Sequence, residues 1–378
     1  MHKGIAMRFR PSVFASLMSL CGASFAAGGA GLTKPVKLPA FDAARATCSA
    51  PIGFKKKLVF VQDNRREFMQ GVGRGLEAAA RARGLGYSVA FANNDPALMI
   101  KQLDGILNDK TGAIVVAPID PLSLAPALNK VIGAGTYVGA IVPPPATTIL
   151  NAPQYLTGKV LGEAAADYIR TRLGGKAKVV LLTHDSLRFL APRFTAMRDT
   201  LRALPGVTIV ADLSPATVDK EGGYRTMKTI LLAHSNVDVV LGADTVVLGA
   251  LAALREAGKA RPNQFLGGID GEHEAVAEIK RGGSPYKASI SLASPIFGYA
   301  MGQHAADWLD GKSVPQAMDI LPKALTSSNI ADYERDTANP GAVYANPLRR
   351  SAYLRMYGNI CFDTRENYVN FPWSSETR

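Results

Sequence analysis

The sequence predicts an α/β fold made of two doubly wound parallel-sheet units, and three observations lead to this prediction. Short apolar runs rich in β-branched residues alternate with amphipathic helical patterns from Lys57 to Lys312. The short runs are apolar throughout, which indicates parallel strands that helices cover on both faces. The chain has 378 residues, enough for two domains of roughly 100–200 residues each.

The first unit is expected to contain four strands, at 57–62, 87–93, 112–118 and 136–142. Helical patterns separate these strands, at 67–84, 95–109 and 121–135. The second of these helices has clear start signals, because Asp95 can cap it and Pro96 occupies its first position. A long helix at 157–175 leads into the second unit.

The second unit repeats the alternation. Its strands are expected at 178–184, 207–213, 237–243, 264–270 and 286–293, and its helices at 191–206, 222–235, 245–259, 272–283 and 294–312. Ligands of open α/β sheets lie beyond the carboxyl ends of the strands. Functional residues are therefore expected in the strand-to-helix turns at 62–68, 93–95, 118–122, 142–145, 184–193, 243–245, 270–273 and 292–296.

Residues 1–26 are typical of a secretory signal peptide. Lys3, Arg8 and Arg10 precede an apolar stretch without acidic residues, and small residues follow up to Ala26. The apolar stretch is too short for a membrane span. We therefore expect the chain to be exported, and cleavage of the signal peptide removes these three cations and lowers the formal net charge from +12 to +9.

The two cysteines of the mature chain, Cys48 and Cys361, lie near its opposite ends. An even pair in an exported chain indicates one disulfide, although two buried free thiols remain an alternative because spacing does not fix pairing. The bond would join a leader segment at 27–54 to a C-terminal extension at 333–378. The extension is rich in aromatic residues, so we expect it to pack on the fold or across its hinge.

Several functional classes lack their sequence signatures. The longest basic run is Lys55–Lys57, and no nucleic-acid-binding motif accompanies it. The three glycines within 71–75 lie inside a helix with the wrong spacing for a dinucleotide, so close packing against the sheet is the better interpretation. The adjacent residues at 184–186 cannot form a catalytic triad, and the histidines lack metal-binding spacing. We expect no enzyme activity, no cofactor and no metal.

Arg65, Arg66 and Phe68 stand at the end of the first strand, where a ligand cleft is expected. Arginine offers a fork of donors for carboxylates and paired hydroxyls, and an aromatic ring can lie against an apolar ligand face. Solvated turn residues are the alternative interpretation of the two arginines. Asp244 and Asp270 follow two further strands, and each could bind a ligand or cap a helix; for Asp244 we favour the cap.

Four stretches carry a family resemblance: "GLEAAARARGLGYSVAFANNDPALMIKQLDGILNDKTGAIVVAPIDPLSLAPALNKVIGAG", "HSNVDVVLGADTVVLGALAALREAGK", "FLGGIDG" and "GYAMGQHAADWLDGKSVP". Through them, residues from about 55 to 325 resemble the type I periplasmic solute-binding proteins of ABC importers, the group that includes ribose-binding protein. The resemblance implies two lobes that three crossovers join and that close on a ligand by hinge motion. It places the N-lobe at 55–152 plus 295–318, the C-lobe at 153–294 plus 319–332, and the crossovers near 151–153, 292–295 and 319–323.

The binding residues of the family carry over unevenly. The family's asparagine after the first strand falls on Arg66, its aromatic pair on Phe68 and Met69, and its aspartate in a late turn on Asp270. Its arginine before the first C-lobe helix falls on Ala191, with Arg193 two places further on. Other polar family positions fall on Val142, Pro143, Ala243 and Leu292. The candidate ligand contacts are Arg66, Phe68 and Asp270, followed by Arg65, Met69, Arg193 and Asp244.

The resemblance implies an exported, monomeric protein that binds a small polar solute between its lobes and delivers it to an ABC permease without chemistry. The lost polar positions argue against a sugar bound in the standard way. The two adjacent arginines suggest a sugar-like ligand with an acidic or strongly accepting group and some apolar area. A periplasmic sensor that presents its closed form to a histidine kinase or chemoreceptor is the alternative, with the C-terminal extension as its docking surface.

Overall fold

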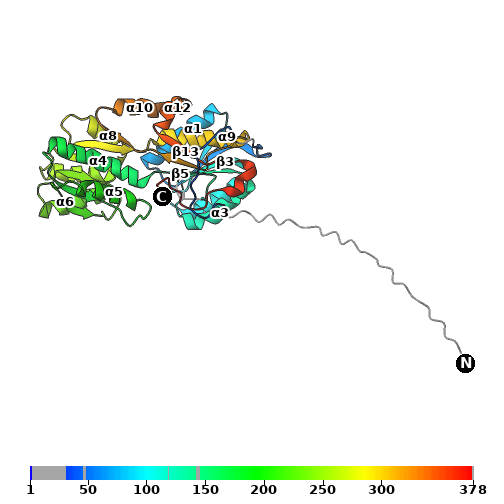
Figure 1. The fold of residues 1–378 in the computed structure, drawn as a ribbon, viewed down its shortest axis with the longest axis horizontal. Helices are drawn as coiled ribbons and strands as arrows, with labels where there is room; N and C mark the ends of the chain where they lie inside the picture. Colours follow the sequence, from blue (N-terminus) through cyan, green and yellow to red (C-terminus); the bar gives the residue numbers. More distant parts are fainter. Residues whose placement is uncertain (2–30, 46–47, 118, 142–144, 377–378) are drawn as a thin grey trace.

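The computed structural model describes residue 1 and residues 31–45, 48–117, 119–141 and 145–376. Within these residues the chain forms two α/β lobes that lie side by side (Figure 1). The predicted signal peptide at 1–26 lies outside the described residues, except for Met1. Val142 and Pro143, on which two polar positions of the family fall, lie outside them as well. The predicted α/β fold with two lobes is confirmed.

The N-lobe sheet contains β1 (Lys55–Gln62), β2 (Gly86–Phe91), β3 (Thr111–Val116), β4 (Tyr137–Ile141), β5 (Thr148–Asn151), β11 (Ala317–Ile320) and β13 (Leu354–Tyr357). Its helices are α1 (Glu67–Ala82), α2 (Pro96–Asn108), α3 (Pro121–Ala134) and α9 (Ser294–Leu309). Among the described residues, the strands lie in the order β13-β11-β5-β4-β3-β1-β2. Asp95 caps α2 as predicted, since its side chain accepts hydrogen bonds from the backbone N–H groups of Ala97 and Leu98.

The C-lobe sheet contains β6 (Ala177–Leu182), β7 (Val207–Leu213), β8 (Val239–Leu241), β9 (Phe265–Asp270), β10 (Tyr286–Ser291) and β12 (Lys323–Leu325). Its helices are α4 (Gln154–Arg172), α5 (Ala191–Arg202), α6 (Lys220–Ala233), α7 (Asp244–Glu256) and α8 (His273–Lys280). The strands lie in the order β12-β10-β9-β8-β6-β7 within the described part of the chain. The central strands of both sheets are buried on both faces, as their continuous apolar runs predict.

The sheets are mostly parallel, and each has one antiparallel edge strand that the sequence did not predict. β12 pairs with β10, and β13 pairs with β11, in antiparallel register. Both edge strands, together with β5 and β11, have only three or four residues. Such short segments show no periodicity over a window long enough to identify them.

The chain passes between the two sheets four times within the described residues. The first three passages run from β5 to α4, from β10 to α9 and from β11 to β12, and the fourth runs from β12 through the C-terminal extension to β13. β5 and β11 are parallel neighbours, and the Asn151 side chain donates a 2.8 Å hydrogen bond to the Asp319 carboxylate. In the passage after β10, Ala293 adopts a left-handed conformation with φ of 40°. The first and third passages are therefore linked side by side, and the second turns sharply.

The glycines of α1 allow close packing against a helix. A Cβ atom on Gly75 would overlap the backbone of Pro295 and Tyr299 in α9, and one on Gly298 of α9 would overlap the backbone of Val72. The sequence analysis assigned these glycines to packing against the sheet, which is wrong for Gly75. The close contact fixes α1, and the turn before it, against the start of α9.

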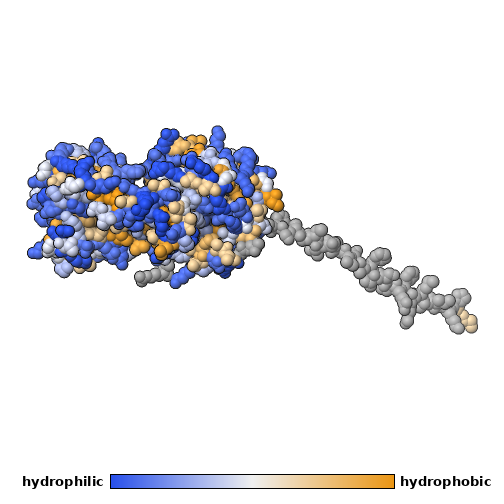
Figure 2. Space-filling view, turned by 90° about the horizontal axis from the view of Figure 1, so that it is seen from above, coloured by the Kyte–Doolittle hydropathy of each residue, from blue (hydrophilic) through white to orange (hydrophobic). Residues whose placement is uncertain are grey.

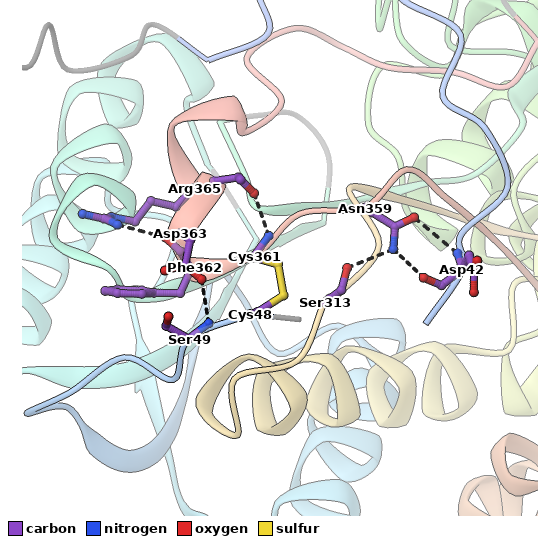
Figure 3. The surroundings of a disulfide bond; sticks show 10 residues. Asp42, Cys48, Ser49, Ser313, Asn359, Cys361, Phe362, Asp363 and Arg365 are labelled. Carbon is purple, nitrogen blue, oxygen red and sulfur yellow. Dashed lines mark hydrogen bonds between the residues drawn. A yellow bond between two sulfur atoms is a disulfide. The ribbon is translucent and has the colours of Figure 1, made fainter. Parts of the chain in front are cut away.

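The leader and the C-terminal extension lie beside each other on the N-lobe. The extension contains α10 (Ile330–Ala338), α11 (Pro340–Ala345), α12 (Pro347–Ser351), β13 and the 3₁₀ helix η1 (Phe362–Asn367). Cys48 and Cys361 form a disulfide with Cα atoms 5.6 Å apart (Figure 3). The structure therefore contains the predicted disulfide and not two free thiols. Nearby, the backbone N–H of Ser49 donates to the Asp363 carboxylate, and Asn359 donates to the backbone of Asp42.

The extension also contacts the C-lobe at two places. At its beginning, Tyr333 of α10 shares a hydrogen bond with Ser291 at the end of β10, and Glu334 pairs with Lys280 of α8. At its end, the Glu376 carboxylate accepts hydrogen bonds of 3.1 and 2.7 Å from the backbone N–H groups of Tyr155 and Leu156 in α4. The extension thus contacts both lobes. Of the two predicted placements, this agrees with packing across the hinge.

Replacement of Glu376 by alanine should destabilise the protein by about 1 kcal/mol, the usual effect of removing a helix N-terminal cap. The reason is that α4 has no cap from its own N-cap residue, Pro153. Urea unfolding of the two proteins measures the difference. Glu366→Ala is a matched control, because Glu366 is an exposed carboxylate of the same extension. Equal midpoints for the Glu376 variant and the control would contradict this role.

No helix in the described part of the chain is long and apolar enough to cross a membrane. The face seen from above in Figure 2 is mainly hydrophilic, and its apolar residues form small, separate groups.

Candidate functional site

A cleft of about 590 Å³ lies between the lobes, beyond the carboxyl ends of strands from both sheets. The N-lobe contributes the turns after β1 and β3, and the C-lobe contributes those after β6, β8 and β9. Residues at the first three connecting passages line it as well, at Ala152, Leu292 and Ile320. The cleft therefore sits where the strand-end rule for open α/β sheets predicts a ligand.

Five of the seven predicted contact residues line this cleft. They are Arg66, Phe68, Met69, Arg193 and Asp270. The other two, Arg65 and Asp244, do not contribute to its lining.

On the N-lobe side, Arg66 is held by its own turn. Its Nη2 donates to the Asp63 carboxylate at 3.2 Å and its Nε to the Asn64 side chain at 2.9 Å. Asp63 is buried, and burial raises the pKa of its carboxyl although Arg66 and Asn64 lower it. The positive charge of Arg66 therefore has a partner in the absence of any ligand.

Phe68 and Met69 form the apolar part of the same turn. Phe68 packs against Phe297 of α9 with ring centroids 5.5 Å apart, and Met69 is buried. Because α9 begins directly after a connecting passage, this aromatic contact ties the cleft wall to the hinge region. Phe68 keeps part of its ring exposed to the cleft.

On the C-lobe side, Arg193 lies almost wholly buried near the start of α5. Its Nε donates to the Gln154 side chain at 2.8 Å. Burial lowers the pKa of Arg193, and the nearby charge of Asp270 raises it again. No hydrogen bond joins Arg193 to Asp270 within the described residues, so the ends of both side chains remain available to a ligand.

Asp270 ends β9 and occupies an unusual backbone conformation. Its φ is 123°, in a region that side chains other than glycine rarely adopt. Burial raises the pKa of Asp270, whereas Arg193 and Arg66, one from each lobe, lower it. Charged residues with a strained backbone and a perturbed pKa occur preferentially at functional sites.

Arg65 points away from the cleft, contrary to the prediction. Its guanidinium lies 4.7 Å from the ring centroid of Phe91, at the end of the neighbouring strand β2. The contact is a cation–π interaction on the outer side of the turn. The two side chains leave the turn in different directions, and of the two arginines Arg66 lines the cleft.

Asp244 supports the cleft from beneath instead of lining it or capping a helix. It is the first residue of α7, and Ala243 occupies the cap position. Its buried carboxylate accepts hydrogen bonds from Tyr286, from Ser289 and from the backbone N–H of Glu272. Burial raises its pKa to about 6. Asp244 therefore holds the 270–272 turn in place, and its predicted capping role is wrong.

Glu272 lines the cleft, although the sequence analysis did not select it. Burial raises its pKa to about 8, and the charges of Asp244, Asp270 and Glu67 contribute in the same direction. The sequence offered one indication of this position, because Glu272 belongs to the 270–273 turn, where functional residues were expected.

We expect Glu272 to contribute a loss of stability as the pH rises from about 4.5 to 8. An unfolded glutamate loses its proton near pH 4.5, whereas the folded protein keeps the Glu272 proton to about pH 8. The folded state binds more protons in this window, so a rising pH favours unfolding. Glu272→Gln should reduce the slope of melting temperature against pH, and Glu274→Gln, an exposed neighbour, should not. Identical slopes for both variants would refute this account.

His184 is a second residue that sequence reasoning missed. It is buried, its ring packs edge-on against Phe194, and its Nε2 has no hydrogen-bond partner within the described residues. Burial lowers its pKa, which favours the neutral ring. A neutral imidazole in the cleft wall can donate or accept one hydrogen bond to a ligand.

The two lobes touch at one edge of this region. The carboxylate of Glu67, at the start of α1, accepts a 3.0 Å hydrogen bond from the backbone N–H of His273, at the start of α8, and contacts the His273 ring. A carboxylate is stabilised at a helix N-terminus by the helix dipole. Among the described residues, no cluster of three or more His, Cys, Asp or Glu side chains could hold a metal ion.

The sequence profile of the periplasmic binding protein domain matches residues 58–313. This chain belongs to the periplasmic binding protein family. Its membership agrees with two α/β lobes and a cleft between them. The matched range ends before the C-terminal extension, which is therefore an addition to the domain that defines the family.

Individual periplasmic binding proteins are similar to this chain at low identity. The ribose import binding protein of Bacillus subtilis is 25% identical over 267 residues, which cover 68% of this chain and 83% of that protein. The xylitol-binding protein of Mycolicibacterium smegmatis is 26% identical over 266 residues, covering 68% and 73%. The structure of the Caulobacter myo-inositol binding protein has 25% identity and a TM-score of 0.61, and the match covers 75% of this chain and 98% of that chain.

Proposed function

We propose that this protein is the substrate-binding component of an ABC importer and binds a small sugar or polyol in the interlobe cleft. The observation that carries the proposal is the arrangement of opposite charges there. Arg66 from one lobe and Arg193 and Asp270 from the other face a single cleft. The similar proteins, named for ribose, xylitol and myo-inositol, support the same ligand class.

The side chains suit a polyhydroxylated ligand. Each hydroxyl both donates and accepts a hydrogen bond, so a site for several hydroxyls needs donors and acceptors together. Arg193 and Arg66 supply donors, Asp270 supplies acceptors, and His184 can supply either. Phe68 can cover the apolar face of a ring. These roles require binding only, and the proposed function involves no chemical step.

An acidic ligand has weaker support than the adjacent arginines suggested. Arg65 faces away from the cleft, and Arg66 already contacts Asp63. The lining contains Asp63, Asp270 and Glu272 beside the two remaining arginines. An anion would meet these carboxylates as well as the arginines, so we favour a neutral solute.

The ligand would couple binding to closure because its contacts come from both lobes. A ligand that touches both lobes favours the closed state over the open one. Export through the predicted signal peptide at 1–26 would place the protein in the periplasm, where it would deliver the solute to a permease as a monomer. The alternative of a sensor has no separate observation in its favour.

A thermal-shift screen tests the proposal with neutral sugars, polyols, sugar acids and small aromatic acids. A ligand at 100 times its dissociation constant stabilises the folded protein by about 2.7 kcal/mol, which raises the melting temperature. Stabilisation by a neutral sugar or polyol, together with loss of its uptake in cells that lack the protein, supports the proposal. Stabilisation by the aromatic or sugar acids alone would refute it.

A further inference from the structure

Large apolar side chains stand exposed along one rim of the cleft. Leu187, Phe189 and Val218 expose 39%, 61% and 52% of their surfaces, and all three line the cleft. Leu187 and Phe189 lie in the loop between β6 and α5, and Val218 lies in the loop between β7 and α6. We refer to these three residues as the apolar rim; it belongs entirely to the C-lobe.

The loop that carries Leu187 and Phe189 has a defined backbone structure. It is folded by backbone hydrogen bonds from Leu187 to His184 at 3.0 Å and from Leu190 to Leu187 at 2.8 Å. Phe189 lies inside this turn, which fixes the position of its backbone beside the cleft. Apolar surface left in water is unfavourable, and patches of it on soluble proteins commonly mark binding surfaces.

The interior of the cleft continues this apolar character. Leu190, Phe194 and Ile269 line it beside the charged side chains. Ala243 and Leu292, two positions at which the family resemblance implies polar side chains, line it as well. The volume of about 590 Å³ lies within the range of about 300–1,000 Å³ that is typical of drug-sized ligands, and it leaves room beside one sugar ring.

We propose that the solute bound here is a sugar or polyol that carries an apolar substituent, and that the apolar rim binds this substituent. The inference rests on the proposed function and names a narrower ligand class within it. Arg66, Arg193 and Asp270 would bind the hydroxylated part. The alkyl or aryl group would extend toward Phe189 and remove the rim from water.

Matched pairs of glycosides test the inference by titration calorimetry on the full mature chain. The pairs are methyl and phenyl β-D-ribofuranoside, and methyl and phenyl β-D-glucopyranoside. We expect the phenyl member of a pair that binds to bind about tenfold or more tightly, because its ring buries apolar surface against the rim. Phe189→Ser should weaken binding of the phenyl glycoside more than that of the methyl glycoside, and so reduce this ratio toward one.

Leu232→Ser is the matched control variant. Leu232 is 89% exposed on α6 of the same lobe and does not line the cleft, so the variant should keep both affinities and their ratio. Equal affinities for the methyl and phenyl members would overturn the inference and leave the proposed function standing. An equal loss of both affinities in Phe189→Ser would also overturn it, because the rim would then act in lobe closure. Absence of binding by every glycoside and by the neutral sugars and polyols of the screen would overturn the proposed function itself.

Discussion

Replacement of Arg193 by methionine should weaken ligand binding about 10- to 150-fold, since hydrogen bonds to a charged group are worth about 1.5–3 kcal/mol. Arg193 is buried in the cleft wall, its Nε is held by Gln154, and its remaining donors have no partner within the described residues. Methionine replaces the unbranched stem of the arginine side chain and has no hydrogen-bond donor. Titration calorimetry with the sugar or polyol selected by the thermal-shift screen measures the loss.

The chain offers a graded series of arginines as controls for this prediction. Arg66→Met should weaken binding less than Arg193→Met, because Arg66 is largely exposed and shares its charge with Asp63. Arg65→Met should leave binding unchanged, because Arg65 lies over Phe91 outside the cleft. Equal losses in the Arg193 and Arg65 variants would show that the cleft described here is not the binding site.

Removal of the disulfide by joint replacement of Cys48 and Cys361 with serine should destabilise the protein by about 2–5 kcal/mol. The bond joins residues 313 positions apart, and a cross-link that closes a long loop restricts the unfolded chain strongly. The loss should be visible as a lower urea midpoint under oxidising conditions. It should affect ligand affinity much less, because neither cysteine lines the cleft.

A reducing agent separates this effect from any change in packing that serine introduces. Reduction should lower the midpoint of the unaltered protein toward that of the double variant, and it should leave the double variant unchanged. A double variant as stable as the unaltered protein would mean that the leader and the extension hold together without the bond.

The central part of the fold could be predicted because its strands are buried on both faces. Runs such as Val179–Leu182 are apolar at every position and lie between amphipathic helices, which fixes both the element type and the parallel arrangement. The edge strands could not be predicted in the same way. β13 forms because β11 presents an unpaired edge, and that edge is created by residues far away in the sequence.

The sequence predicted the position of the candidate site more completely than it predicted which side chains line it. The strand-end rule selects the turns that contain Arg66, Arg193 and Asp270, and all three line the cleft. The direction of a side chain within a turn depends on backbone conformation, which is why Arg65 was misplaced. Asp244 was misassigned for a related reason: its partners Tyr286 and Ser289 come from a strand more than 40 residues later.

The path of the chain has a consequence for the order in which the lobes can fold. All C-lobe elements except β12 come from one continuous stretch, from α4 to β10, so most of this lobe can form as soon as that stretch has emerged. The N-lobe sheet is instead assembled from three separate parts of the chain, and its edge strand β13 lies near the C-terminus. We therefore expect the lobe that begins first in synthesis to be completed only after β13 has emerged, later than most of the C-lobe.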